Sequence, residues 1–387
     1  MELNEIEIKA ILSETLDPAV VDGIAQKMVE AWKKIEDKWG NHSLDGLAEH
    51  DYKAKIKDMS DCFSIYLSGA DVKKNTIELI YNKLFGDVPE SNSPFLVIAA
   101  GAIASGKSTV IKCVLPEKYG KYGEVDKDKI KASNIFHTYI HEKLGDEHGN
   151  MIEDFMLALR DDIGKMAINA KKSILLEQSC KTDGFLDTCK LAKEAGFKVH
   201  AEVVITPIAF TILRNVYRYV TGLIEDEKTK KKTARYEAFV NIKDTYDNAP
   251  LVLAELWESY ADDITVYTSD ILKIDTNGKT MAQIFGEATE GPISDISFEI
   301  AGRMYDYVMK NIDYVKNNQD IMKSLKITKK KLAKLSADPR LSYCAMPQKW
   351  QPKGVRDELD RLNGPLGFVY SKRLDDNDSR RYKIENI

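Results

Sequence analysis

The chain has 387 residues, a formal net charge of −5 and an apolar share of 43%. This length is enough for two or three domains of roughly 150 residues each, and the negative charge gives no general attraction to nucleic acid. The longest apolar run, from Phe95 to Ala104, is too short to span a membrane. The five cysteines contain no C-x-x-C pair, which favours reduced thiols in the cytoplasm over a disulfide framework.

Residues 1–92 are predicted to form a helical amino-terminal domain. Apolar residues recur at helical spacing from Val21 to Trp39 and again from Ile77 to Leu84. Such stripes are typical of helix packing, although they also fit a surface for a partner protein or a segment that covers a nucleotide site. Residues 87–94, with the sequence DVPESNSP, are expected to form a linker.

Strands and helices are predicted to alternate over residues 93–272, which we expect to be a second domain. Short apolar runs predict five strands, at 95–100, 122–126, 173–177, 198–206 and 264–269. This alternation is typical of an α/β fold with a doubly wound parallel sheet. Ligands bind such sheets at the carboxyl ends of the strands, so the residues directly after each strand are the candidates for function.

Residues 273–387 are expected to form a third region that is mixed but mostly helical. The stretch 271–280 contains an Asn-Gly pair, which predicts a small hairpin. Residues 294–335 have a mainly helical pattern, and we interpret the lysine-rich stretch 323–334 as part of a solvated amphipathic helix. The prolines after position 336 favour an irregular tail.

The sequence GAIASGKS at 101–108 matches the P-loop pattern G-x-x-x-x-G-K-[ST]. It lies between a predicted strand and a predicted helix, which is the context that a phosphate-binding loop requires. Lys107 would reach the β- and γ-phosphates of a nucleotide, and the Ser108 hydroxyl would bind Mg²⁺. The expected nucleotide-binding residues are Gly101, Ala102, Ile103, Ala104, Ser105, Gly106, Lys107, Ser108 and Thr109.

Acidic residues follow the second and third predicted strands. Asp126 and Asp128 are two positions apart and face the same way, so one can accept a substrate hydroxyl proton while the other orients metal or backbone. Asp128 is equally suited to cap the helix that begins near Lys129. Glu177 ends an apolar strand, which favours contact with metal, water or substrate over an ordinary surface position.

Arginine is scarce in the chain, yet three arginines lie close together in the sequence. Arg214 and Arg218 are four positions apart and share one face of a predicted helix. Arg235 follows the charged run EDEKTKKKTA, which has the composition of a mobile lid. Guanidinium groups in such positions can clamp a transferring phosphoryl group. Ordinary solvated charge explains the neighbouring lysines better than it explains these arginines.

The order and spacing of these elements resemble the zeta toxin family of P-loop kinases over about residues 95–270. The resembling elements are the P-loop, the strand end V-D-K-D, then L-L-E, K-E-A-G-F-K-V, T-I-L-R and the lid arginine. The resemblance implies the fold of a P-loop kinase. It also implies an activity, which is the Mg²⁺-dependent transfer of the γ-phosphoryl group of ATP to the 3′-hydroxyl of the aminosugar in UDP-N-acetylglucosamine. Some effector-type relatives phosphorylate NAD, so NAD or another nucleotide is the alternative acceptor.

The resemblance also implies roles for individual residues. Asp128 matches the catalytic base, which favours that role over helix capping. Further matches are the P-loop pair Lys107 and Ser108 and the phosphate-contacting arginines Arg214 and Arg235. Arg218 can replace Arg214, because the interval between Arg214 and Arg235 is longer than usual in the family.

Glu177 matches the acid of the family's I-E-G-T element, so the resemblance implies that Glu177 binds the substrate. Asp126 is expected to bind the substrate as well, because of its position after the second predicted strand. This chain has Gln178-Ser179 where the family has Gly-Thr, which is a departure in the part concerned with substrate recognition. The resemblance implies an antitoxin or another regulatory protein as a partner, and the flanking segments suggest an effector delivered to a host cell. The alternative outside the enzymes is a nucleotide-switch protein, in which nucleotide binding regulates the flanking domains without catalysis. The pattern around Asp128 and the lid arginine favours the kinase, because a switch needs no base for a substrate hydroxyl.

Overall fold

The structure is a computed structural model that describes residues 3–40, 49–143, 150–229, 234, 236–268, 273–290, 293–332 and 337–338. The chain divides into two compact units. The described residues of the first lie within 3–88 and 123–172, and those of the second lie within 89–122, 173–229 and 234–338. This division differs from the three consecutive segments expected from the sequence, because residues 123–172 pack with the amino-terminal helices and the carboxy-terminal helices pack with the second unit.

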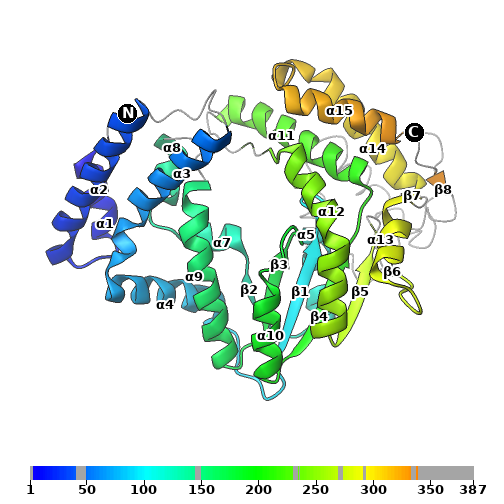
Figure 1. Ribbon diagram of the computed structural model, residues 1–387, viewed down its shortest axis with the longest axis horizontal. Coiled ribbons are helices and arrows are strands. Elements are labelled where there is room, and N and C mark those ends of the chain that lie inside the picture. The colour runs from blue at the N-terminus through cyan, green and yellow to red at the C-terminus, as the bar shows by residue number, and fades with distance from the viewer. Residues whose placement is uncertain are drawn as a thin grey trace. The chain divides into compact units, whose positions relative to one another are not determined.

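Helices make up most of the first unit. Helices α3 and α4 both pack against α9, and α1 packs against α2 (Figure 1). The elements of this unit are α1 (Glu5–Ser13), α2 (Pro18–Trp39), α3 (Glu49–Ser64), the 3-10 helix η1 (Ile65–Ser68), α4 (Ala70–Phe85), β2 (Gly123–Val125), α7 (Lys127–Ala132), α8 (His137–Lys143) and α9 (Asn150–Asn169).

An aromatic cluster explains why part of the second predicted domain belongs to the first unit. The ring of Phe63 lies 5.8 Å from the ring of Trp32 and 5.5 Å from that of Phe136, centroid to centroid. The ring of Tyr66 also lies 5.5 Å from that of Phe136. Asn134 Nδ2 donates a hydrogen bond to Tyr66 Oη at 3.0 Å. The loop between α7 and α8 is therefore part of the amino-terminal core.

Five strands of the second unit form one sheet in the order β3-β1-β4-β5-β6. Strand β1 pairs in parallel with both β3 and β4, and β4 pairs in parallel with β5. The predicted parallel sheet is thus confirmed, except that the edge strand β6 is antiparallel to β5. The strands are β1 (Phe95–Gly101), β3 (Ile174–Gln178), β4 (Lys198–Val204), β5 (Asp263–Tyr267) and β6 (Lys273–Ile274).

Both faces of the sheet are buried, as expected for a doubly wound arrangement. On one face, Val97 and Ala99 of β1 share a core with residues of α5 (Lys107–Cys113) and α6 (Leu115–Lys118). Leu96 and Ile98 point to the opposite face and are also fully buried. Helix α10 (Leu186–Glu194) packs against β4. The apolar runs in the sequence therefore mark strands in the centre of an α/β layer structure.

The hairpin expected at 271–280 is wrong. Asn277-Gly278 does form a turn, and Gly278 has the positive φ of +66° that favours glycine there. However, the strand before this turn pairs with β5, and helix α13 (Met281–Glu290) follows the turn directly. The predicted turn is therefore present, but the strand before it pairs with β5 of the main sheet and not with a strand after the turn.

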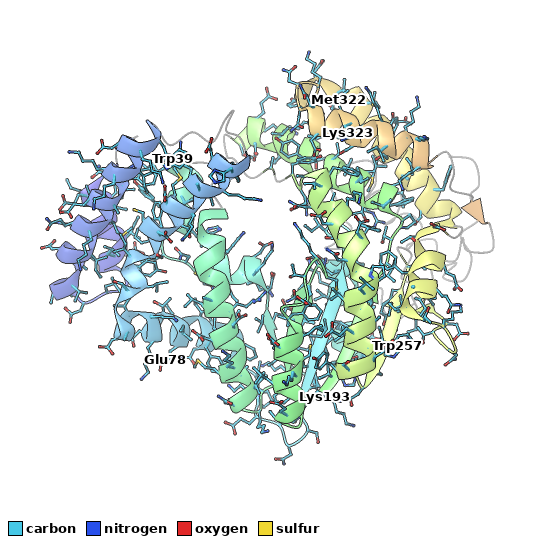
Figure 2. All side chains as sticks on the ribbon, viewed as in Figure 1. Trp39, Glu78, Lys193, Trp257, Met322 and Lys323 are labelled. Atoms are coloured by element: carbon cyan, nitrogen blue, oxygen red, sulfur yellow. The ribbon has the colours of Figure 1, made fainter. Side chains whose placement is uncertain are left out.

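The carboxy-terminal helices pack against α11 in a second core. This core joins α11 residues such as Leu213 and Val216 to α14 and α15 residues such as Met304 and Leu325. On α15, Lys323 is exposed while Met322 packs partly against the core, which confirms the predicted amphipathic helix (Figure 2). The remaining elements are α11 (Ile208–Thr229), α12 (Phe239–Glu255), the π-helix η3 (Leu256–Tyr260), β7 (Ile293–Ser294), α14 (Asp295–Lys310), the 3-10 helix η4 (Ile312–Tyr314), α15 (Gln319–Leu332) and β8 (Ala337–Asp338).

Every helix within the described ranges is too short or too polar to cross a membrane.

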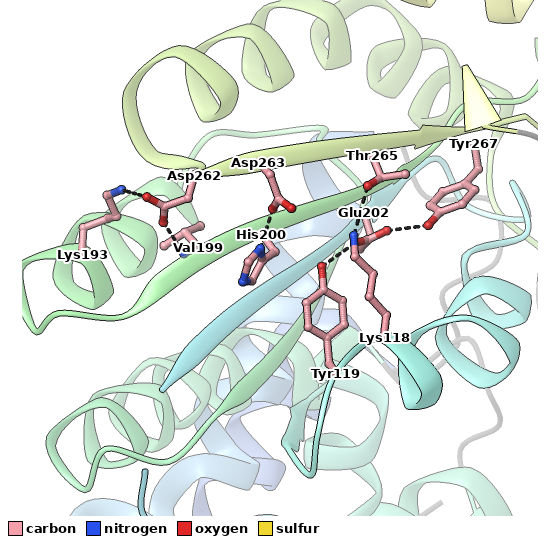
Figure 3. A network of polar contacts seen from close by, with 10 residues as sticks. All are labelled: Lys118, Tyr119, Lys193, Val199, His200, Glu202, Asp262, Asp263, Thr265 and Tyr267. Atoms are coloured by element: carbon pink, nitrogen blue, oxygen red, sulfur yellow. Dashed lines mark hydrogen bonds and ion pairs between the residues drawn. The ribbon is translucent and has the colours of Figure 1, made fainter. Parts of the chain in front are cut away.

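A buried carboxylate connects the sheet to the end of α6 (Figure 3). Glu202 in β4 is 1% exposed, and it accepts hydrogen bonds from Lys118 Nζ at 2.5 Å and Tyr119 Oη at 2.5 Å. Tyr267 Oη of β5 donates a third bond to Glu202 at 2.8 Å. Burial, and then the negative charge of Glu202, raises the pKa of both tyrosines, so their hydroxyls remain donors at neutral pH. Glu202 can stay in the core because its oxygens have these partners.

Asp320 of α15 holds the start of α12. Its Oδ2 accepts a hydrogen bond from Phe239 N at 2.9 Å and another from Tyr236 Oη at 2.8 Å. Phe239 is the first residue of α12, and the N-cap position is occupied by Ala238, which has no side-chain oxygen. Asp320 therefore supplies from another helix the acceptor that a capping residue normally provides.

We expect Asp320→Ala to lower the free energy of unfolding by about 1–3 kcal/mol, because two donors lose their acceptor. Asp313→Ala is the control, since this side chain is 83% exposed and pairs with nearby Lys316, and it should change stability by about 0.5 kcal/mol or less. Urea unfolding of both variants measures the difference. Equal stability of the two variants would contradict the capping role of Asp320.

Candidate functional site

The P-loop connects the carboxyl end of β1 to the start of α5, as the sequence predicted. Gly101 ends the strand with φ +150°, and Gly106 precedes the helix with φ +107°. A Cβ atom on Gly101 would lie 2.5 Å from Val204 O and 2.8 Å from Ser105 Oγ. Glycine is therefore required at this position both for its backbone conformation and for the space around it.

The ammonium group of Lys107 lies inside the loop. Lys107 is 7% exposed, and its Nζ donates hydrogen bonds to Gly101 O at 2.7 Å and Ala102 O at 2.9 Å. Glu177 Oε1, at the end of β3, lies 3.7 Å from the same Nζ. Ser105 Oγ is also buried in the loop, and it has no hydrogen-bond partner among the residues that the structure describes. A buried cation beside an unsatisfied hydroxyl suits a ligand with anionic oxygens, as a phosphate has.

The loop is anchored through the carbonyl oxygen of Ser105. This oxygen accepts a hydrogen bond from Thr206 Oγ1 at 2.8 Å and another from Arg214 Nη1 at 3.2 Å. The guanidinium of Arg214 also lies over the ring of Phe210, 5.6 Å from its centroid. Tyr246 Oη of α12 donates to Thr206 O at 2.5 Å. The segment after β4, together with α11 and α12, thus fixes the position of one loop residue.

The three arginines predicted to contact the phosphates differ in their distance from the P-loop or in whether the structure describes them. Arg214 reaches the P-loop, as described above. Arg218, one turn later on α11, is exposed, and its Nη2 lies 3.4 Å from Asn215 Oδ1. Arg235 lies outside the described residues. Among the arginines that are described, Arg214 is therefore the one in contact with the loop that bears Lys107.

The end of β3 has two polar residues that face opposite sides of the sheet. Leu175 belongs to the core on the α5 side, so Glu177 faces that side and Gln178 faces the other. This alternation agrees with the short distance from Glu177 to Lys107. Gln178 Nε2 is buried and has no hydrogen-bond partner in the described part of the chain.

The backbone after β3 is packed tightly against the P-loop. Cys180 has a positive φ of +58° and is buried. Burial raises the pKa of its thiol to about 12, while the Lys107 charge and a hydrogen bond with the Gly101 backbone act in the opposite direction. Lys181 O accepts a hydrogen bond from Asn248 Nδ2 at 3.2 Å, which ties the same loop to α12.

The acids after β2 lie in the first unit. Asp126 is the N-cap of α7, because its Oδ1 accepts a hydrogen bond from Asp128 N at 2.9 Å. The capping role considered for Asp128 therefore belongs to Asp126. The Asp128 side chain is 50% exposed, and its Oδ1 lies 3.9 Å from Lys131 Nζ.

Residues 81–288, which are more than half of the chain, match the family model described as zeta toxin. The chain belongs to the zeta toxin family. None of the curated proteins has a sequence that matches it.

The fold of this zeta toxin family member is similar to that of a chain from the PezAT chromosomal toxin-antitoxin system of Streptococcus pneumoniae. The identity is 16% and the TM-score 0.53, over 62% of this chain and 97% of that chain. A chain of the AvrRxo1-ORF1:AvrRxo1-ORF2 complex has 14% identity and a TM-score of 0.42, over 76% of this chain and 97% of that chain. The first likeness confirms the expected P-loop kinase-type α/β fold, and the second is too low to support a structural conclusion.

Two residues that anchor the loop of this zeta toxin family member were not predicted from the sequence. Thr206 is the second residue after β4, and polar residues just after a parallel strand are candidates for contact with the site. Tyr246 gives no such signal, because it lies inside α12 and meets Thr206 only through tertiary packing.

Gly101→Ala should weaken nucleotide binding by about tenfold or more, because the added Cβ forces the loop away from its backbone conformation. Gly120→Ala is the matched control, since a Cβ there has nothing within 4 Å. Calorimetric titration of both variants with Mg-ATP measures the effect. Wild-type affinity in Gly101→Ala would show that the loop geometry does not govern binding.

Proposed function

We propose that this zeta toxin family member is an ATP- and Mg²⁺-dependent kinase whose acceptor is a hydroxyl group of a nucleotide sugar such as UDP-N-acetylglucosamine. The observation that carries this proposal is the position of Lys107 inside the P-loop, with Arg214 bonded to the same loop. Two cations around one phosphate-binding loop supply the charge stabilisation that phosphoryl transfer requires.

The donor half of the site would be formed by the P-loop. Loop N–H groups and Lys107 would bind the phosphates, and the ammonium would exchange its contacts with the Gly101 and Ala102 carbonyls for phosphate oxygens. The unsatisfied Ser105 hydroxyl is available as a further donor. Mg²⁺ held through the Ser108 hydroxyl would neutralise charge on the β- and γ-phosphates.

In the reaction, the acceptor hydroxyl oxygen would form a bond to the γ-phosphorus, and the bond from that phosphorus to the β,γ-bridging oxygen would break. ADP would leave, and the hydroxyl proton would pass to the Asp128 carboxylate. The finding that Asp126 caps α7 supports this role, because Asp128 is not required for capping. Glu177 and Asp126 would orient the acceptor.

A protein antitoxin is the regulatory partner that we propose. The support is the family and the similar fold of a chain from the PezAT toxin-antitoxin system. Such a partner would prevent phosphorylation of the acceptor inside the cell that makes the protein.

Asp128→Asn should lower kcat by about 10²–10⁴-fold, because the amide cannot accept the hydroxyl proton. Wild type and variant are incubated with Mg-ATP and UDP-N-acetylglucosamine, NAD or a small-molecule cell extract, and mass spectrometry detects a compound that gains one phosphoryl group. Asp61→Asn is the control, since its side chain is 66% exposed on α3. No product from the wild type with intact ATP binding would refute the kinase proposal, whereas equal rates in Asp128→Asn would refute only the role of the base.

Arg214→Ala should reduce kcat/KM by about 10²–10³-fold, because it removes both a loop anchor and a charge beside the phosphates. The loss should exceed that of Arg218→Ala by about tenfold or more, since Arg218 is exposed and lies against Asn215. The same product assay measures both variants. A larger loss in Arg218→Ala would assign the phosphate contact to Arg218 instead.

A further inference from the structure

The side-chain amide of Gln178 has a buried donor without a partner. Its Nε2 is shielded from solvent and makes no hydrogen bond with any residue that the structure describes. A buried, unsatisfied polar group costs about 1–3 kcal/mol, and such groups are uncommon in folded proteins. A ligand oxygen at this position would remove that cost.

Gln178 lies where a ligand of this fold would bind. It is the last residue of β3, and its register partner on β1 is Ala100, one residue before the P-loop begins. Ligands of open α/β sheets bind outside the carboxyl ends of the strands. The preceding residue, Glu177, lies 3.7 Å from the Lys107 ammonium. The unpaired amide is therefore adjacent in the chain to a residue that contacts the phosphate loop.

The amide is also held by a rigid neighbourhood. The following loop is fixed by buried Cys180 and by hydrogen bonds from Lys181 to α12, in which Lys181 Nζ donates to Asn241 Oδ1 at 2.6 Å and Lys181 O accepts from Asn248. A small shift of this loop to satisfy Gln178 would disturb these contacts. A donor held in place before binding favours the ligand that presents an oxygen to it.

We propose that Gln178 Nε2 donates a hydrogen bond to an oxygen atom of the phosphate acceptor and thereby selects that acceptor. This inference rests on the proposed kinase function and adds a specificity-determining residue to it. Gln178 faces the side of β3 opposite to Glu177, so it contacts a part of the acceptor other than the part that Glu177 orients. A substrate without an oxygen at that point would leave the donor unpaired and be disfavoured.

Gln178→Met tests this inference, because methionine has a similar length and no donor. Three results are expected: kcat/KM for the acceptor falls about tenfold or more, the affinity for Mg-ATP is unchanged, and the melting temperature does not fall. The last result distinguishes a ligand-binding amide from a structural one, since Nε2 has no hydrogen bond to lose among the described residues. Gln26→Met is the control, because Gln26 is exposed and donates to Glu30 within α2.

The acceptors used are UDP-N-acetylglucosamine, NAD and the small-molecule cell extract, each with wild type and variant. Unchanged kcat/KM, weaker ATP binding or a lower melting temperature in Gln178→Met would each overturn the assignment to the acceptor. If the wild type phosphorylates nothing, the kinase function fails and this assignment fails with it. If the wild type forms product and Gln178→Met forms it equally well, only the assignment of Gln178 is refuted.

Discussion

The parallel pairing of β1 with β3 on one side and β4 on the other is the constraint on which the site depends. Parallel strands end at the same edge of a sheet, so the residues that follow them converge there. The register places Gln178 beside Ala100, and Val204 beside Gly101. The P-loop, the Glu177-Gln178 pair and Thr206 thus come together although long stretches of sequence separate them.

The second constraint is the anchoring of Ser105 O by Thr206 and Arg214. A loop that must surround phosphates with backbone N–H groups gains from being held in one shape before the nucleotide arrives. Tyr246 extends the anchor to α12, and Asp320 holds the first turn of that helix from α15. The carboxy-terminal helices therefore support the nucleotide loop through a chain of hydrogen bonds and packed helices.

Strands and the P-loop were predictable because their signals are local. Uninterrupted apolar runs such as FLVIAA require burial on both faces, and the loop pattern needs glycine at positions such as Gly101, where φ is +150°. The organisation of residues 123–172 was not predictable in this way. It depends on contacts such as that between Phe63 and Phe136, which join distant segments and have no local pattern. The pairing of β6 with β5 was unpredictable for the same reason, because the turn after β6 does not indicate which strand β6 pairs with.

The sequence by itself determined the phosphate loop, the alternation of strands and helices, and the two acids and the glutamate that follow strands. Their local residue types are sufficient, because backbone conformation and burial pattern depend mostly on neighbours in the chain. Only the tertiary structure showed that Arg214 rather than Arg218 reaches the loop, that Thr206 and Tyr246 anchor it, and that Gln178 Nε2 has no partner in the described part of the chain. These outcomes depend on which side chains meet in space, and hydrogen bonds across a fold leave no trace in residue spacing.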